Sequence, residues 1–247
     1  MISIKDKRRW GDILKLKADD VKKRYGVYGH YYNFEFQYES YPCRSMLDMV
    51  DHDDTPLIPT ELVDRRPSAL VVMMNPGSSR PVQDTYRPVT VNSVSDIPVT
   101  RELVPAVPDT TQYQVLKIAM AMNWRHVRIL NISDLRESKS TLFFEKDLAL
   151  RNHEDGDFHT LWSDNRTQER QALLGNNDIP ILVGWRQSSC VLPLAKLCWS
   201  QISDRNPIGV RSSYTDPVFF HPSPMLQEKK NEWLIDVLNQ LHDEEEK

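Results

Sequence analysis

The feature that most constrains the fold of this chain is an alternation, from about residue 68 onward, between short apolar runs and amphipathic stretches. Apolar runs of strand length fall at 69–74, 127–131, 179–183 and 217–220, and helical patterns fall at 108–124, 187–203 and 224–242. This alternation is typical of βαβ units. The sequence therefore predicts an α/β fold, a three-layer α/β/α arrangement around a mostly parallel four-stranded central sheet.

Other parts of the chain depart from this rhythm. Residues 77–108 are rich in proline and show no periodicity, which predicts a long loop of the kind that is usually functional or disordered. Residues 138–165 are expected to form a surface insertion. The predicted organisation is an N-terminal extension packed on the core (1–67), an α/β domain (68–242) and an acidic tail (243–247).

The N-terminal extension is basic at its start and then unusually aromatic. Residues 1–24 carry nine lysines and arginines against four aspartates, and this segment either lies along a phosphate backbone or forms a solvated helix face. The aromatic residues that follow suit either stacking on bases or packing against a sheet edge: Tyr25, Tyr28, Tyr31, Tyr32, Phe34, Phe36, Tyr38 and Tyr41.

Composition narrows the class of protein. Hydrophobic residues make up 40% of the 247 residues, which is enough for a core, yet no apolar run is long enough to span a bilayer. The polar start predicts no secretion signal, and the three cysteines lack the paired spacing of a metal or cluster site. We therefore expect a reduced, cytoplasmic protein without metal or cofactor. The net charge of −4 argues weakly against a DNA-coating protein but allows an enzyme with a local basic face.

Polar residues of special geometry follow all four predicted strands. They are Asn75-Pro76-Gly77, Asn131-Ile132-Ser133-Asp134, Gly184-Trp185 and His221-Pro222-Ser223-Pro224. Binding sites in parallel α/β sheets collect at the carboxyl ends of the strands, so we expect these segments to line one crevice.

The residue types in this crevice suit cleavage of a glycosidic bond to a nucleobase. Such a reaction needs stabilisation of the departing base, a positioned water and recognition of the flipped base. His221 can supply the first, Asn75 the second and Asn131 the third. Each residue also has a simpler interpretation: Asn75 as a turn residue, Asn131 as a strand-end cap, and His221 as a histidine satisfied by backbone in a proline turn.

Together these segments resemble the uracil-DNA glycosylase superfamily. Met74-Asn75-Pro76-Gly77 is similar to the GMNPG motif of its single-strand-selective monofunctional branch and to the GINPG motif of its mismatch-specific branch, and 221–224 match the HPSP motif in full. The resemblance implies a uracil-DNA glycosylase-like sheet, with Asn75 and His221 as catalytic residues. It also implies a substrate-binding set of Pro76, Gly77, Tyr86, Asn131, Ser223 and Met225, in which Tyr86 would stack on the base and Met225 would wedge into DNA.

The sequence also departs from this superfamily. The GQDPYH form of the first motif and the cysteines of the iron–sulfur branches are both absent. A looser resemblance, over about 68–225, is to an uncharacterised bacterial domain family with NPS, DPT, NLFxxR, WG and HPL signatures. That resemblance implies no activity, but it draws attention to Asp109 and Arg136, of which Asp109 is also explained as a helix cap.

The first functional hypothesis is a monofunctional DNA glycosylase that excises a damaged or modified base, in DNA repair or in defence against phage with modified DNA. The alternative is a catalytically silent nucleobase- or nucleotide-binding protein, or a nucleoside hydrolase, on the same fold. A partner-binding module, supported by the charged termini, ranks third.

Overall fold

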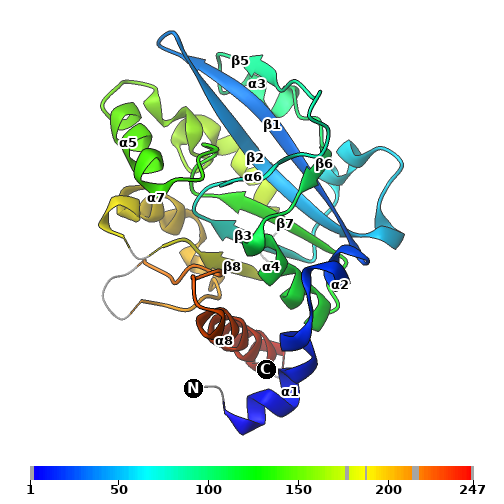
Figure 1. Cartoon of the computed structure of the whole chain (residues 1–247). Coiled ribbons are helices and arrows are strands. Elements are labelled where there is room, and N and C mark those ends of the chain that lie inside the picture. The colour runs from blue at the N-terminus through cyan, green and yellow to red at the C-terminus, as the bar shows by residue number, and fades with distance from the viewer. Residues whose placement is uncertain (1–2, 176–177, 187, 213–216, 246–247) are drawn as a thin grey trace.

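The computed structural model describes residues 3–175, 178–186, 188–212 and 217–245. It confirms an α/β fold, in which helices cover both faces of one eight-stranded mixed sheet (Figure 1). The strand order is β4-β6-β1-β2-β7-β3-β8, and β5 pairs with β1. The strands are β1 (Tyr25–Phe36), β2 (Glu39–Asp51), β3 (Ala69–Met73), β4 (Arg80–Pro81), β5 (Val89–Val91), β6 (Val104–Val107), β7 (His126–Asn131) and β8 (Ile181–Gly184).

Three of the four predicted strands form a parallel unit within the sheet. β3 lies in the middle and pairs in parallel with β7 on one side and with β8 on the other. Every residue of these three strands is buried, as expected for parallel strands that are covered on both faces. Their carboxyl ends therefore lie side by side at one edge of the sheet.

The fourth predicted strand, 217–220, is wrong. This segment forms an isolated antiparallel bridge between Phe219 and Arg211, and the Phe220 N–H donates to the carbonyl of Val210. Its apolar run is therefore satisfied by the neighbouring 208–212 segment, which itself bridges to β8 at Leu182. The described sheet is mixed, because β2 pairs antiparallel with β7.

Residues 25–51 of the expected N-terminal extension belong to the sheet itself. They form the long β1–β2 hairpin, visible in blue in Figure 1, and β2 pairs directly with β7. Tyr31 and Tyr32 are fully buried, whereas Tyr38 is exposed at the hairpin turn. Most of the N-terminal aromatic rings therefore pack in the core.

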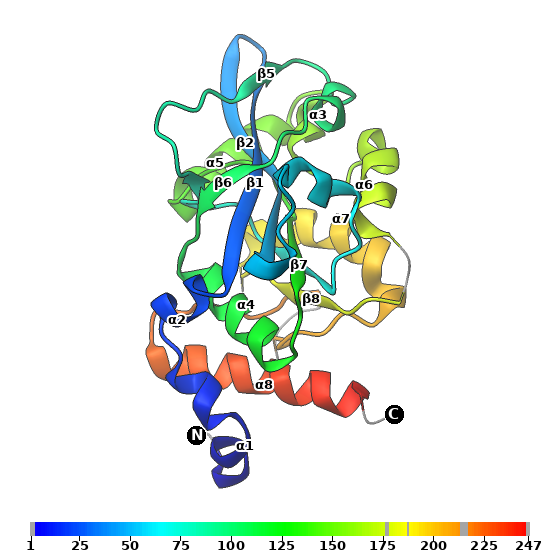
Figure 2. The same cartoon turned by 90° about the vertical axis from the view of Figure 1, so that its right-hand side faces the viewer.

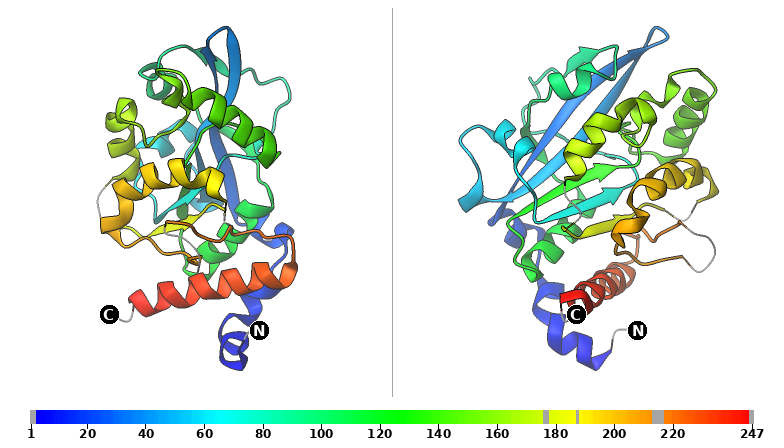
Figure 3. Two further views of the ribbon diagram at one scale, coloured as in Figure 1. Left: turned by 90° about the vertical axis from the view of Figure 1, so that its left-hand side faces the viewer. Right: turned by 180° about the vertical axis from the view of Figure 1, so that it is seen from behind.

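The helices form two groups on opposite faces of the sheet (Figures 2 and 3). Leu70 and Val72 of β3 face one group, while Val71 and Met73 face the other. The first group comprises α5 (Ser140–Arg151), α6 (Thr167–Leu174) and α7 (Leu192–Ile202); the second comprises α1 (Ile4–Lys15), α2 (Ala18–Lys22), α4 (Thr110–Ala121) and α8 (Gln227–Glu245). α4, α7 and α8 match the three predicted helices, and α8 includes Asp243–Glu245 of the expected acidic tail, whose residues 246 and 247 lie outside the described residues.

Two other segments differ from expectation. Residues 77–108 carry β4, β5, β6 and α3 (Asp96–Val99), so they extend the sheet edge and do not form a loop without elements. Residues 138–165 bury Phe143, Phe158 and Trp162 in the core, so they are not a surface insertion. Short 3-10 helices complete the chain: His52–Asp54, Pro59–Asp64, Gly156–His159, Asp164–Arg166, Ser189–Val191 and Ser203–Arg205. Within the described ranges, no helix has the length and apolar character needed to cross a bilayer.

Candidate functional site

A pocket of about 520 Å³ opens beyond the carboxyl end of β3. Its described lining comes from five places in the sequence: 74–78, 109–111, 137–140, Arg186 and 221–225. Of the predicted site residues, five line this pocket: Asn75, Gly77, His221, Ser223 and Met225. The two motifs that carry the family resemblance, separated by more than 140 residues in the sequence, therefore meet at one hollow.

Asn75 is fixed by the segment that follows β7. Its Nδ2 donates to the backbone carbonyl of Leu135 at 3.2 Å and to that of Glu137 at 2.7 Å. Both amide protons are used in this way, so the orientation of the side chain is determined and Oδ1 remains as its available acceptor. Such an acceptor can receive a hydrogen bond from a water molecule in the pocket.

His221 has a defined tautomer. The backbone N–H of Ser223 donates to its Nδ1 at 3.1 Å, and because an N–H only donates, Nδ1 must be the acceptor. Burial lowers the pKa of His221, so the neutral ring is favoured and its proton resides on Nε2. His221 lines the main pocket and also a second hollow of about 400 Å³ toward α8. It therefore offers one N–H donor from a partly buried position.

The structure corrects the expectation for Asn131. This residue is 1% exposed and does not line the pocket. In the amide orientation that satisfies both of its polar atoms, it donates to the backbone carbonyl of Asn75 at 3.3 Å and accepts from Nη2 of Arg44 at 3.1 Å. Asn131 is therefore buried behind Asn75, where it binds the backbone of that residue. From this position its amide cannot form hydrogen bonds with a base in the pocket.

Two further predicted residues lie away from the pocket lining. Pro76 is buried beneath it, and Tyr86 packs half-buried against the cluster formed by α4, α8 and the sheet. Burial is also the main reason why the pKa of Tyr86 is raised. Stacking of Tyr86 on a base does not fit this position.

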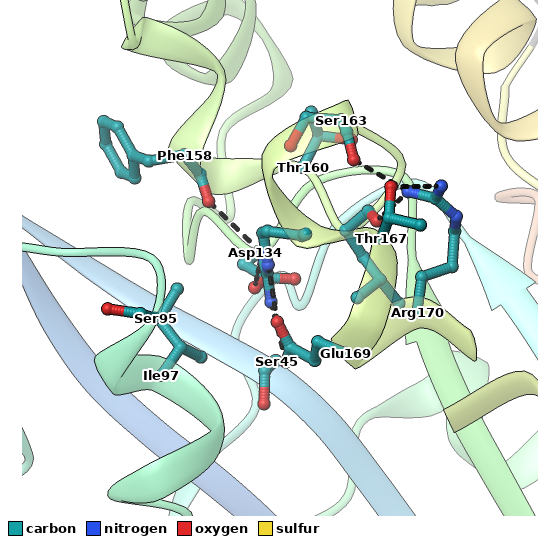
Figure 4. Close-up of polar contacts among 12 residues, drawn as sticks. Ser45, Ser95, Ile97, Asp134, Phe158, Thr160, Ser163, Thr167, Glu169 and Arg170 are labelled. Atoms are coloured by element: carbon teal, nitrogen blue, oxygen red, sulfur yellow. Dashed lines mark hydrogen bonds and ion pairs between the residues drawn. The ribbon is translucent and has the colours of Figure 1, made fainter. Parts of the chain in front are cut away.

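The segment that follows β7 enters a buried ionic cluster, and Figure 4 shows Asp134, Phe158 and Glu169 in it. Asp134 and Arg166 are both fully buried, and Nη1 of Arg166 lies 2.6 Å from Oδ2 of Asp134. Arg166 also binds Glu169 at 2.7 and 3.0 Å and the carbonyl of Phe158 at 3.2 Å, and Tyr32 donates to Asp134 at 2.8 Å. This cluster anchors the 131–137 segment, whose carbonyls hold Asn75.

Gly184, at the end of β8, sets the position of the His221 loop. A Cβ atom at residue 184 would lie 2.8 Å from Cδ of Pro222 and 3.2 Å from the carbonyl oxygen of Phe220. The proline ring is rigid, so this segment must move if the contact is filled. The close approach of the two backbones therefore requires glycine.

Replacing Gly184 with alanine is expected to lower the free energy of unfolding by about 1–3 kcal/mol, the usual cost of overpacking. Urea unfolding measures this change. The matched control is Gly11→Ala in α1, where a Cβ meets nothing within 4 Å and the higher helix propensity of alanine favours stability. Equal stability of Gly184→Ala and the wild type would show that the loop does not pack closely on β8.

Sequence reasoning missed several lining residues. Ser138 and Ser140 come from the segment expected to form a surface insertion, Glu137 directly precedes that segment, and Arg186 directly follows the Gly184-Trp185 strand end. Arg186 donates to the Ser140 hydroxyl at 2.6 Å, which joins the β8 end to the start of α5. No motif in the sequence marks Glu137, Ser138 or Ser140, which lie at or just before the start of α5.

Asp109 and Arg136, to which the looser resemblance drew attention, differ in position. Asp109 caps α4 and lines the pocket. Arg136 does not line it: its Nε donates to the carbonyl of Ser79 at 3.1 Å, and its guanidinium lies 5.0 Å from the centre of the Tyr31 ring. Arg136 therefore has a structural role behind the site.

The chain was compared with known proteins at the levels of family, sequence and structure. No protein-family model matched it, and neither a curated protein nor a solved structure gave a significant match. The resemblance to the uracil-DNA glycosylase superfamily therefore stays a prediction that depends on the two motifs.

Proposed function

We propose that this protein is a monofunctional DNA glycosylase that flips a damaged or modified base out of DNA and hydrolyses its N-glycosidic bond. The observation that carries the proposal is that the Ser223 N–H donates to Nδ1 of His221, which leaves Nε2–H as the donor of the neutral ring, and that His221 lines the same pocket as Asn75. The product is an abasic site, formed in DNA repair or in defence against phage with modified DNA.

The two residues suit the two halves of the reaction. The base leaves with the electron pair of the C1′–N bond, and a neutral imidazole that donates from Nε2 stabilises the negative charge that develops on it. Asn75, held through Nδ2, presents Oδ1 to a water whose oxygen bonds to C1′. The reaction needs no redox change.

Met225 favours DNA as the substrate. Its side chain is 99% exposed beside the pocket, and the neighbouring Leu226 is 68% exposed. Exposed apolar side chains are costly in water, but they are the groups that architectural and repair proteins insert between base pairs. Pro222 and Pro224 stiffen the loop that carries them.

The uracil-DNA glycosylase-like fold is part of this proposal. The parallel strands β8, β3 and β7 are central to it, because the two motifs follow β3 and the segment beside β8. The antiparallel β1–β2 hairpin is then an addition along one edge of this parallel unit.

Hydrolysis of a free nucleoside is the second candidate, and the charge around the pocket favours it. The described lining contains two carboxylates, Asp109 and Glu137, against one lysine or arginine, Arg186. No residue of the basic 1–24 segment takes part, and Lys15 and Lys22 of that segment pair with Asp12 and Asp19. A pocket with more carboxylates than cations attracts the phosphate backbone of DNA less strongly than a basic pocket does.

Mass spectrometry of released free bases distinguishes these functions. The panel contains normal, deaminated and hypermodified DNA, each single- and double-stranded, and the corresponding free nucleosides. We expect release from at least one DNA and an abasic product in that strand. Release from nucleosides alone selects the second candidate, and no release from any member of the panel contradicts both.

A further inference from the structure

Asp109 is one of the pocket residues to which the two motifs assign no role. It is the N-cap of α4, where its Oδ1 accepts from the backbone N–H groups of Thr111 at 2.9 Å and Gln112 at 3.1 Å. Gln112 returns a bond through Oε1, which accepts from the Asp109 N–H at 2.9 Å. This capping box fixes the direction of the carboxylate through one of its two oxygens.

The second oxygen faces the asparagine motif. Oδ2 accepts no hydrogen bond from any described residue, and it lies 3.6 Å from the position that a Cβ atom would take at Gly77. Gly77 has a φ of +61°, a conformation that favours glycine. The missing side chain thus leaves Oδ2 uncovered beside Gly77, in the pocket that Asn75 also lines.

The other carboxylate of the pocket is engaged elsewhere. Oε2 of Glu137 pairs with Nζ of Lys146 at 2.9 Å, and Oε1 accepts from the Lys139 N–H at 3.1 Å. These contacts lower the pKa of Glu137 and occupy both of its oxygens. Asp109 has no ion pair with a described cation, so its negative charge acts on the pocket itself.

Asp109 does not form a charge-relay pair with His221 through Nδ1. That atom already accepts from the Ser223 N–H. The two residues therefore act on different parts of a substrate: the histidine as a donor, and the carboxylate as an acceptor.

We propose that Asp109 is the catalytic base, and this assignment rests on the proposed glycosidic hydrolysis. The water held by Asn75 gives a proton to Oδ2 of Asp109, its oxygen forms the bond to C1′, and the C1′–N bond breaks with its electron pair passing to the base. The anionic carboxylate also stabilises the positive charge that the sugar gains in an oxocarbenium-like transition state. The base anion is stabilised by His221 and takes up a proton from solvent.

The test uses Asp109→Asn and Asp109→Ser, since both residues cap helices about as well as aspartate but carry no charge. We expect the single-turnover rate of base release to fall by about 10²- to 10⁴-fold, the contribution typical of general acid–base catalysis. The Kd for the same DNA, measured by fluorescence anisotropy, and the thermal unfolding midpoint should remain close to those of the wild type.

The matched control is Asp20→Asn, the same change in the first turn of α2, where Asp20 accepts from the Lys17 N–H at 2.8 Å outside the pocket lining. It should release bases at the wild-type rate. Undiminished release by Asp109→Asn and Asp109→Ser, or a loss that lies in Kd alone, overturns the assignment of Asp109 and leaves the proposed function intact. A wild-type protein that releases no base overturns both.

Discussion

Replacing His221 with asparagine is expected to slow base release by about 10²- to 10³-fold, the loss seen when one donor to a developing anion is removed. The asparagine Oδ1 takes the place of Nδ1, so the bond from the Ser223 N–H, 3.1 Å in the wild type, can be kept. Only the donor at the Nε2 position is lost. The rate is measured under single-turnover conditions on the DNA that the panel identifies.

His221→Gln is the matched counterpart. Its Nε2 reaches the position of the imidazole Nε2 and restores a donor, while the acceptor toward Ser223 is lost. We expect this variant to release base faster than His221→Asn, although the local loop is less well fixed. The opposite order, or full activity of His221→Asn, would show that the histidine serves only the turn that it closes with Ser223.

The central strands were predictable because each contains a short apolar run, which is typical of a strand that is buried on both faces. β3 is apolar along its whole length, β7 carries Val127, Ile129 and Leu130, and every residue of both strands is buried. β2 was not recognised, because it buries Arg44, Ser45 and Asp48 within its apolar residues. The buried charge of Asp48 is compensated by Arg128, which lies 80 residues further along the chain on β7. Nε of Arg128 donates to Oδ1 of Asp48 at 2.9 Å. No local window of sequence contains that pair.

Segment 217–220 was predicted to be a strand of the sheet, but it forms only an isolated bridge. Its apolar run resembles a strand, but what such a run pairs with depends on the chain before it, and here 210–212 is close enough to pair first. The His221 motif nevertheless reaches the expected edge. Its position is fixed by Pro222 against Gly184 and by Trp233, whose Nε1 donates to the carbonyl of Phe220 at 3.2 Å.

The site was predictable where backbone geometry determines it. Asn75 directly follows the apolar run of β3 and His221 directly follows the apolar 217–220 run, and both residues line the pocket. Asn131 depends on where β7 ends: its neighbours Leu130 and Ile132 pack on the α5–α7 face, and Asn131 itself lies beneath the asparagine motif. A shift of one residue in a strand reverses the direction of a side chain, and sequence patterns do not locate strand ends that closely.

Disruption of the buried ionic cluster around Arg166 is expected to lower the free energy of unfolding more than the other changes considered. Arg166 is fully buried and binds two carboxylates, Asp134 and Glu169, and the carbonyl of Phe158. Arg166→Met fills much of the same volume but leaves Asp134 buried without its cation. Removing one partner of a buried ion pair typically costs about 3–5 kcal/mol, and we expect a loss of that size in the free energy of unfolding, measured by urea titration at neutral pH.

The pH dependence of this loss identifies its cause. Burial raises the pKa of Asp134, and Arg166 opposes that rise, so in Arg166→Met the pKa should rise further. A carboxyl with a raised pKa binds its proton more readily in the folded state than in the unfolded state. Acidification therefore favours the folded form of the variant, and its deficit relative to the wild type should shrink as the pH falls through the raised pKa of Asp134 in the variant.

Lys15→Met provides the comparison for an exposed pair. The Lys15 and Asp12 side chains are 78% and 99% exposed, so we expect a change of about 1 kcal/mol or less. If Arg166→Met costs as little as Lys15→Met, or if its deficit is the same at every pH, the charge of Arg166 is not what stabilises the segment. A full loss that shrinks with acidification would show that the charge of Arg166 stabilises the buried Asp134, which belongs to the same segment as the carbonyls of residues 135 and 137 that bind the amide of Asn75.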